Sequence, residues 1–219
     1  MLQFTVIAGP NGAGKSTLSQ RFSPADALIF DPDKQKSLIE KQYPDIAEDA
    51  LESAVTDKYH SFELHAIAEL KHLTVETNLR NEFLAEQATI FKNAGYRTNI
   101  IFLLLPDMKT SMDRVNLRVK QKGHFVDAES IIYNYQHSLE NLYRVAPRFD
   151  RLMLLNAAPK YGIISTPELI LTVKDNVITP HPDLVAPWVT GIVERIVIAF
   201  NNNLRDEDLG NSETRGRGH

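Results

Sequence analysis

The chain has 219 residues, 43% of them hydrophobic, which is enough for one large domain with a buried core. Its formal net charge is −4 and its isoelectric point is about 6.0, so we expect no nucleic-acid partner. Cysteine is absent, which excludes disulfides and thiolate metal sites. No apolar run approaches the ~20 residues that span a bilayer. The sequence enters a strand pattern directly, so we expect no signal peptide, no membrane contact and a cytoplasmic protein.

Strand and helix patterns alternate along the chain. Strands are predicted at residues 2–8, 28–30, 73–77, 98–105 and 151–155, and helices at 16–22, 46–70, 82–93, 108–119, 131–142 and 188–200. Asp175-Asn176 divides two short apolar runs and predicts a hairpin. The alternation indicates an α/β fold with a central, mainly parallel sheet flanked by helices. We expect one P-loop domain over residues 1–200 and a polar, disordered tail over 201–219.

The first loop carries the most specific motif of the chain. Its sequence GPNGAGKST fits the P-loop pattern G-x-x-x-x-G-K-[ST] and lies between a predicted strand and a predicted helix. Glycines let successive backbone N–H groups approach phosphate oxygens, and the helix directs its positive N-terminus at the same anion. Lys15 would reach the β- and γ-phosphates of ATP or GTP, and the Ser16 hydroxyl would bind Mg²⁺. The predicted nucleotide-binding residues of the loop are Gly9, Pro10, Asn11, Gly12, Ala13, Gly14, Lys15, Ser16 and Thr17.

Carboxylates follow two further predicted strands. Asp33 comes directly after the strand at 28–30, and Glu76 and Thr77 end the strand at 73–77. The carboxyl ends of parallel strands face the ligand crevice of an open α/β sheet. Asp33 is therefore a candidate base for an attacking hydroxyl, with a turn residue as the alternative. Glu76 would orient a Mg²⁺-bound water or bind substrate hydroxyls, unless it only caps the strand end.

A basic segment follows the strand at 98–105. Arg114 and Arg118 lie four residues apart on one predicted helix face, and Gly123-His124 ends that helix. A basic helix end in this position is where a small kinase carries a lid, whose arginines neutralise charge on the transferred phosphoryl group. We place this lid at approximately residues 114–127, with Arg114 and Arg118 near ATP. The alternative is a solvated basic face, which is common for charge clusters.

Together, GPNGAGKST, the Asp33 loop, VETN and the segment RVKQKGHFVDAESIIYNYQHSLENL resemble the zeta-toxin-like P-loop kinases, over roughly residues 1–156. The resemblance implies an ATP- and Mg²⁺-dependent transfer of phosphate to the 3′-hydroxyl of the amino sugar in UDP-N-acetylglucosamine. It implies Asp33 as base and Arg118 as a lid arginine. Glu76, Thr77, Glu63 and His124 would lie near the acceptor. It also implies a small antitoxin-like partner.

The chain departs from the family pattern in and after the lid. Lys122 stands where members usually carry a second glycine, and Tyr133, Asn134 and His137 stand where they carry arginines. Losing such an arginine lowers phosphoryl-transfer rates by orders of magnitude. We therefore expect a slow kinase, and expect Asn134→Arg to raise its rate. The alternatives are a kinase of another metabolite or of a polynucleotide, and a non-catalytic ATP-binding module with a regulatory partner.

Overall fold

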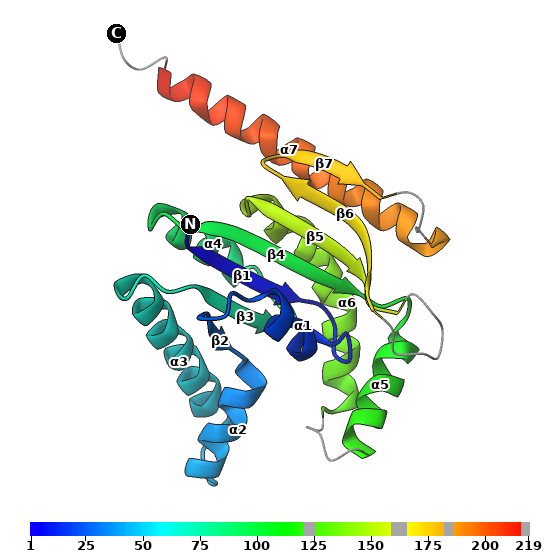
Figure 1. Ribbon diagram of the computed structural model, residues 1–219. Coiled ribbons are helices and arrows are strands. Elements are labelled where there is room, and N and C mark those ends of the chain that lie inside the picture. Colours follow the sequence, from blue (N-terminus) through cyan, green and yellow to red (C-terminus); the bar gives the residue numbers. More distant parts are fainter. Residues whose placement is uncertain (121–125, 159–165, 182–185, 216–219) are drawn as a thin grey trace.

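The fold is built on one seven-stranded sheet (Figure 1). A computed structural model describes residues 1–120, 126–158, 166–181 and 186–215, with side chains up to residue 203. The strands are β1 (Gln3–Ala8), β2 (Leu28–Phe30), β3 (Leu73–Thr77), β4 (Arg97–Leu104), β5 (Arg151–Asn156), β6 (Glu168–Lys174) and β7 (Val177–Pro180). The helices are α1 (Lys15–Phe22), α2 (Pro32–Gln42), α3 (Glu48–Ala68), α4 (Phe83–Asn93), α5 (Met108–Lys120), α6 (Ala128–Val145) and α7 (Thr190–Arg215), with 3₁₀ turns η1 (Ala146–Arg148) and η3 (Pro187–Val189).

The strand order is β2-β3-β1-β4-β5-β6-β7. Strands β1 to β5 pair in parallel, and β6 and β7 are antiparallel. This confirms the predicted α/β class and the mainly parallel sheet. The predicted hairpin also forms, with Asp175 and Asn176 at φ 49° and 64°, the left-handed pair that a tight two-residue turn requires. All five parallel strands deliver their following loops to the same edge of the sheet.

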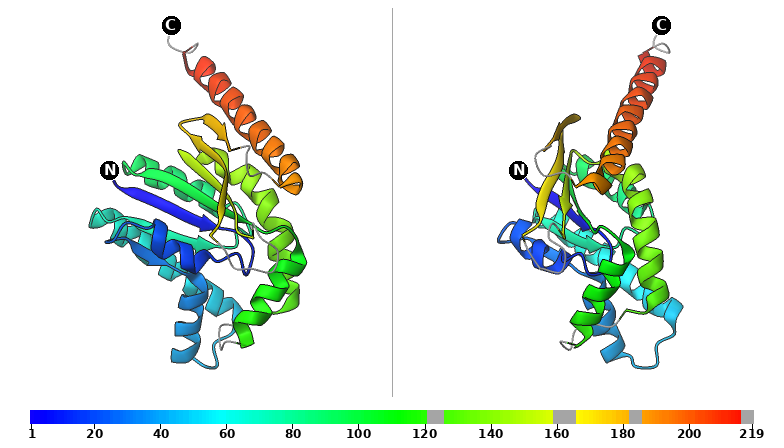
Figure 2. Two further views of the ribbon diagram at one scale, coloured as in Figure 1. Left: turned by 45° about the vertical axis from the view of Figure 1, so that its right-hand side comes forward. Right: turned by 90° about the vertical axis from the view of Figure 1, so that its right-hand side faces the viewer.

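The central strands are buried on both faces. Along β1, Phe4 and Val6 belong to the larger hydrophobic cluster, whereas Ile7 belongs to a smaller one on the opposite face. Helices α3, α4, α6 and α7 cover the first face, and α1 covers the second through Leu18 (Figure 2). The rings of Phe4 and Phe91 stack at 4.1 Å and fix α4 against β1. This two-sided packing holds the P-loop strand rigidly in the middle of the sheet.

Helix α2 is absent from the sequence prediction, which placed Asp33 in a loop and assigned no helix between residues 30 and 46. It begins with Asp31, whose side chain accepts a hydrogen bond from the Lys34 N–H at 3.2 Å, and Pro32 occupies its first turn. Aspartate followed by proline is a favourable helix start. None of its residues is buried, so the helix lacks the apolar stripe by which hydrophobic periodicity reveals a helix in a sequence.

The C-terminal stretch also differs from the prediction of disorder. Helix α7 continues past Phe200 through residues 201–215, and Figure 1 shows this part extending beyond the sheet. Val189, Ile196 and Phe200 are buried and anchor the start of the helix. Once a helix is nucleated, each further residue adds one backbone hydrogen bond, so a polar sequence can continue it. Residues 216–219 lie outside the described part, and a domain boundary at residue 200 stays a prediction.

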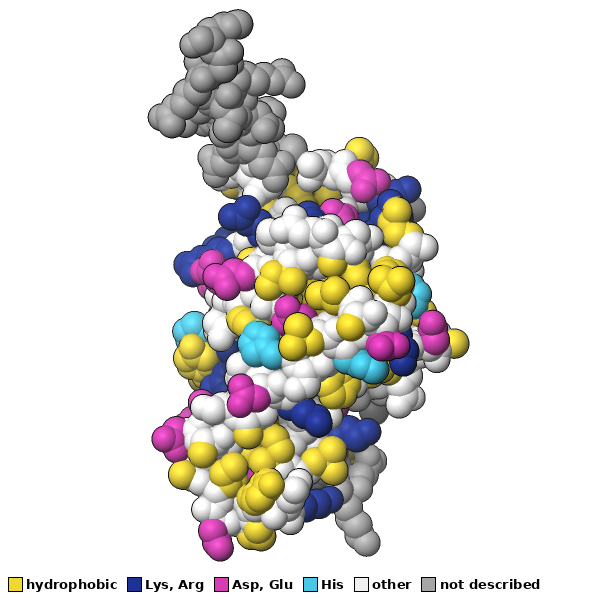
Figure 3. Space-filling view, turned by 90° about the vertical axis from the view of Figure 1, so that its left-hand side faces the viewer, with side chains coloured by type: hydrophobic (Ala, Val, Ile, Leu, Met, Phe, Trp, Pro, Cys, Tyr) yellow, Lys and Arg dark blue, Asp and Glu magenta, His cyan; other side chains and the backbone are white. Residues whose placement is uncertain are grey.

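Charges of both signs are interspersed on the side of the molecule that carries α2 and α3. Figure 3 shows lysine and arginine side chains among aspartates and glutamates on this face, with no continuous basic field. Large apolar side chains, Leu38 on α2 and Leu64 on α3, also remain exposed. This face lacks the single-sign surface by which proteins bind the nucleic-acid backbone. Among the residues that the structure describes, no helix is long and apolar enough to cross a membrane.

Candidate active site

The P-loop joins β1 to α1 at the sheet edge where the parallel strands end. Gly9, Gly12 and Gly14 all have positive φ, at 142°, 76° and 92°. A Cβ on Gly9 would lie 2.6 Å from the carbonyl oxygen of Leu103, so no other residue fits there without moving the neighbouring strand. Helix α1 begins at Lys15, directly after the loop. The free N–H groups of its first turn therefore face the loop's concavity, as an anion site requires.

Lys15 is held by three acceptors. Its ammonium group donates to the carbonyl oxygens of Gly9 and Pro10 at 2.9 and 3.1 Å and to Oδ1 of Asn78 at 2.7 Å. Burial lowers the pKa of Lys15 to about 8, against the opposing attraction of Asp33 and Glu76. The lysine is thus a desolvated cation aimed across the loop, close enough to both carboxylates to respond to their charge.

Glu76 is the buried centre of a second cluster. Its Oε2 accepts a hydrogen bond from the Ser16 hydroxyl at 2.7 Å, and its Oε1 accepts one from Ser19 at 2.6 Å. Burial raises the pKa of Glu76, while these two hydrogen bonds oppose the rise. A serine hydroxyl beside a carboxylate fits Mg²⁺, which prefers oxygen ligands and takes most of the remaining ones from water and phosphate. Within the described residues no cluster of three or more His, Cys, Asp or Glu could hold a metal by itself.

These groups meet in one cavity of about 420 Å³. It contains most of the residues predicted from the sequence. Its lining is Asn11, Gly12, Ala13, Gly14, Lys15, Ser16, Thr17, Leu18, Arg21, Asp31, Pro32, Asp33, Glu76, Thr77, Asn78, Arg114, Leu117, Arg118, Ala157, Thr166 and Pro167. Asp33 and Asp31 come from the start of α2, across the cavity from α5. The volume is in the range of small-molecule sites, and the polar groups converge on it.

The two predicted lid arginines take different positions. Arg114 donates to the carbonyl oxygens of Gly12 and Ala157, at 3.4 and 3.0 Å, and so braces the P-loop against the end of β5. Arg118 lines the same cavity one turn later, and its positive charge contributes to the lowered pKa of Lys15. Arg118 is therefore the arginine whose field reaches the phosphate-binding end of the site.

Two predicted substrate residues are not brought into this cavity. Glu63 lies on α3, where its carboxylate contacts Nδ1 of His60 at 3.0 Å, and it is not among the lining residues. His124 lies outside the described residues. Thr77 does line the cavity, and its hydroxyl accepts the N–H of Leu79 at 2.9 Å, which fixes the turn after β3.

Sequence reasoning missed three contributors to the site. Asn78 was part of the VETN pattern but had no role, although it holds Lys15. Arg21 and Asp31 also line the cavity. Asn78 follows a strand at the crevice edge, which is a usable sequence signal. Its pairing with a lysine 63 positions earlier in the chain is a property of the sheet order and has no local signature.

Tyr133, Asn134 and His137, where the resemblance implies arginines, lie on α6. Tyr133 is exposed, stacks on the His137 ring at 4.0 Å between ring centres, and carries the Arg80 guanidinium 5.2 Å from its ring centre. Asn134 points the other way and is buried against the P-loop, where its Nδ2 donates to Oδ1 of Asn11 at 2.7 Å. None of these three residues lines the cavity that contains Lys15 and Arg118.

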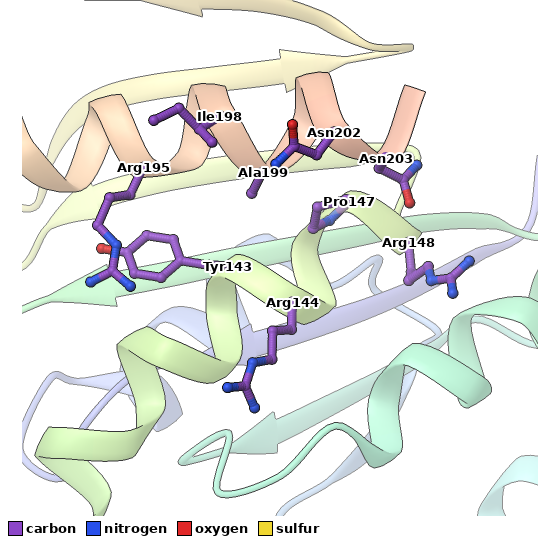
Figure 4. A pocket seen from close by; sticks show the side chains of 9 residues that line it. All are labelled: Tyr143, Arg144, Pro147, Arg148, Arg195, Ile198, Ala199, Asn202 and Asn203. Atoms are coloured by element: carbon purple, nitrogen blue, oxygen red, sulfur yellow. The ribbon is translucent and has the colours of Figure 1, made fainter. Parts of the chain in front are cut away.

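A second cavity, of about 510 Å³, lies between the end of α6 and α7 (Figure 4). Arg144, Arg148 and Arg195 line it, but Figure 4 shows their guanidinium groups pointing in different directions. Arg144 is paired with Glu82, and Arg195 with Glu140 and the Tyr143 ring. The groove has no convergent set of donors, so the P-loop cavity is the candidate active site.

Known proteins resemble this chain in sequence and in fold. An uncharacterized protein of Haemophilus influenzae is 25% identical over 128 residues, which cover 58% of this chain and 88% of that protein. A chain in the structure of the PezAT chromosomal toxin-antitoxin system of Streptococcus pneumoniae superposes with a TM-score of 0.57 at 17% identity, covering 93% of this chain and 88% of that one. A chain in the crystal structure of AvrRxo1-ORF1:-ORF2 with ATP superposes with a TM-score of 0.61 at 12% identity; 90% of this chain is covered, but only 64% of that one.

These structural matches establish the fold, and a family model adds the family. The model for the zeta toxin matches residues 3–160, which contain the P-loop, both carboxylate segments and helices α5 and α6. The match extends over more than half of the sequence and includes every described residue of the candidate site except Thr166 and Pro167. The chain belongs to the zeta toxin family of P-loop kinases.

Proposed function

We propose that the chain transfers the γ-phosphoryl group of ATP, with Mg²⁺, to a hydroxyl of a small molecule, namely a nucleotide sugar such as UDP-N-acetylglucosamine. The meeting of Lys15, Asp33 and the Ser16–Glu76 pair in one cavity is the observation that supports it most. Family membership supports the choice of ATP as the nucleotide, and so does the similarity to the AvrRxo1-ORF1:-ORF2 complex, whose crystal structure was determined with ATP.

Each group has a role that follows from its position. Lys15 and the P-loop amides bind the β- and γ-phosphates. Ser16 would hold Mg²⁺, and the ion would neutralise phosphate charge. Asp33 accepts the proton of the acceptor hydroxyl as that oxygen bonds to the γ-phosphorus. The bond from that phosphorus to the β–γ bridging oxygen breaks, and ADP leaves. Arg118 stabilises charge on the transferred group.

The acceptor would enter from the side of Asp33, Glu76 and Thr77. Both carboxylate oxygens of Glu76 accept hydrogen bonds from serines, one of them Ser16, so we assign Glu76 to the Mg²⁺ site before the acceptor site. The roles of Glu63 and His124 in binding the acceptor remain proposals. Glu63 does not line the cavity, and His124 lies outside the described residues. A small antitoxin-like partner is a further proposal, supported by the toxin-antitoxin system to which the PezAT structure belongs.

The proposal is tested by incubating the purified chain with ATP, Mg²⁺ and UDP-N-acetylglucosamine and following the reaction by phosphorus NMR over hours. A new phosphomonoester signal is expected, with no signal from the Lys15→Ala variant. ATP consumption without a phosphosugar would move the acceptor to another metabolite, to be found with a panel. ATP binding with no phosphorylated product from any acceptor would instead favour the non-catalytic module.

The lowered pKa of Lys15 predicts a pH dependence of ATP binding. Phosphate binding requires the charged ammonium, so affinity should be constant up to about pH 8 and then fall by up to ~10-fold per pH unit as the free protein loses this proton. Calorimetric titration with ATP between about pH 7.5 and about pH 9.5 measures how the affinity depends on pH. Lys15→Arg is the control, since its guanidinium stays charged throughout. Wild-type affinity that does not change across this range would contradict a direct contact between Lys15 and the phosphates.

A further inference from the structure

Side chains tie the tip of the P-loop to both helices that flank residues 121–125. From α5, the Ser111 hydroxyl donates to the backbone carbonyl of Asn11 at 2.6 Å. From α6, Nδ2 of Asn134 donates to Oδ1 of Asn11 at 2.7 Å. Arg114 adds its bond to the carbonyl of Gly12. Asn11 is therefore the point at which the nucleotide loop meets both helices.

The asparagine pair is withdrawn from solvent. Asn11 is 4% exposed and Asn134 is 2% exposed, and Ser111 is fully buried. Within the part of the chain that the structure describes, Oδ1 of Asn134 has no hydrogen-bond partner. A buried amide with an unused acceptor is unfavourable for folding. An apolar side chain at position 134 would remove that acceptor but leave Oδ1 of Asn11 without its donor, so the two costs offset each other. The Asn134 contact therefore points to a role in the loop more than in stability.

From these contacts we propose that Asn134 is a positioning residue that holds the P-loop in its phosphate-binding conformation by way of Asn11. The inference rests on the proposed function in one respect, that the loop binds a nucleotide. Asn11 lies between Gly9 and Gly12, both in left-handed conformations with wide conformational freedom. A loop fixed before binding loses less entropy when phosphate arrives, and that gain appears in nucleotide affinity.

The same burial reverses the expectation for Asn134→Arg. A guanidinium at this position would have to displace Asn11 to reach the cavity, or remain buried without a carboxylate. The variant should therefore bind ATP more weakly than the wild type instead of turning over faster. In this chain, Asn134 organises the loop by a neutral hydrogen bond.

The experiment compares ATP affinity, measured by calorimetry, with melting temperature, measured by circular dichroism. Asn134→Leu keeps a similar volume and removes the unused acceptor. It should melt close to the wild type yet bind ATP about 10-fold more weakly, the loss expected for one hydrogen bond of about 1.4 kcal/mol. Ser138→Ala is the matched control, one turn along α6, where a buried hydroxyl donates to the carbonyl of Tyr135. It should leave ATP affinity unchanged.

A double-mutant cycle then tests whether Asn134 acts through Asn11. In an Asn11→Ala background, Asn134→Leu should have no further effect on affinity, because the contact is already absent. If turnover is measurable, KM for ATP should rise while kcat at saturating ATP changes little.

Two results would overturn this inference alone. One is ATP affinity in Asn134→Leu equal to that of the wild type and Ser138→Ala, which would leave the proposed function intact. The other is an additive cycle, which would mean that Asn134 influences the site by another route. A wild type that binds no ATP would remove the proposed function and this inference together, so the two failures are distinguishable.

Discussion

Replacing Lys15 by alanine is expected to abolish measurable ATP binding, with affinity reduced by at least about 100-fold. A charge-assisted hydrogen bond to phosphate contributes about 3 kcal/mol, and each 1.4 kcal/mol is a factor of ten. Lys15 is already aimed across the loop by Gly9, Pro10 and Asn78, so the alanine variant loses a preorganised cation. Calorimetric titration with ATP measures the effect, and an unchanged affinity would remove the nucleotide assignment.

The same variant also tests the contribution of Lys15 to stability. Lys15 is partly buried and hydrogen-bonded. Because its folded pKa lies below the unfolded value, its charge destabilises the fold below about pH 8, and stability is regained as pH rises from there toward 10.5. The lost hydrogen bonds and the relieved desolvation oppose each other, so the variant should melt close to the wild type at neutral pH.

Asn78 supplies a way to separate these two effects. Asn78→Ala removes one acceptor from the ammonium group but leaves the charge in place. It should therefore lower ATP affinity far less than Lys15→Ala does. A comparable loss from both variants would mean that Asn78 itself binds the nucleotide.

The sequence predicted the sheet and the P-loop because both have local signatures. Val6 and Ile7 are consecutive apolar residues, as a strand buried on both faces requires, and the loop glycines recur at a fixed spacing. Asp33 and Glu76 were found by a topological rule, that loops after parallel strands share one edge, and both line the cavity.

The contacts that complete the site could not be found in this way. Asn134 and Asn11 are 123 positions apart, and only the packing of α6 beside the loop brings them together. The family resemblance implied an arginine at residue 134, after the lid, whereas the asparagine side chain there bonds to the P-loop. Helix α2 was missed for the opposite reason, since it buries no residue and its formation depends on the Asp31-Pro32 start.

The second large effect is expected from replacing Asp33, the proposed general base. Asp33→Asn should retain ATP binding within a few-fold but lower kcat by about 10²- to 10⁴-fold, because an amide cannot accept the acceptor proton. Two aspartates at the start of α2, Asp31 and Asp33, line the cavity, so the matched variant is Asp31→Asn. Asp31 uses its side chain to cap α2, and asparagine caps as well as aspartate. Removing that charge should therefore leave the fold intact and reduce kcat much less.

The pair of variants distinguishes general-base catalysis from a simple charge effect on the site. Both substitutions remove one negative charge near Lys15, and both charges raise the pKa of that lysine. An effect of charge alone would appear in both variants, mainly as altered ATP affinity and a shifted pH profile of binding. Loss of a proton acceptor would appear in one variant only, as a lower kcat at saturating ATP and acceptor. If Asp31→Asn is the inactive protein and Asp33→Asn turns over normally, the base is Asp31, and Asp33 serves the N-terminus of α2 instead.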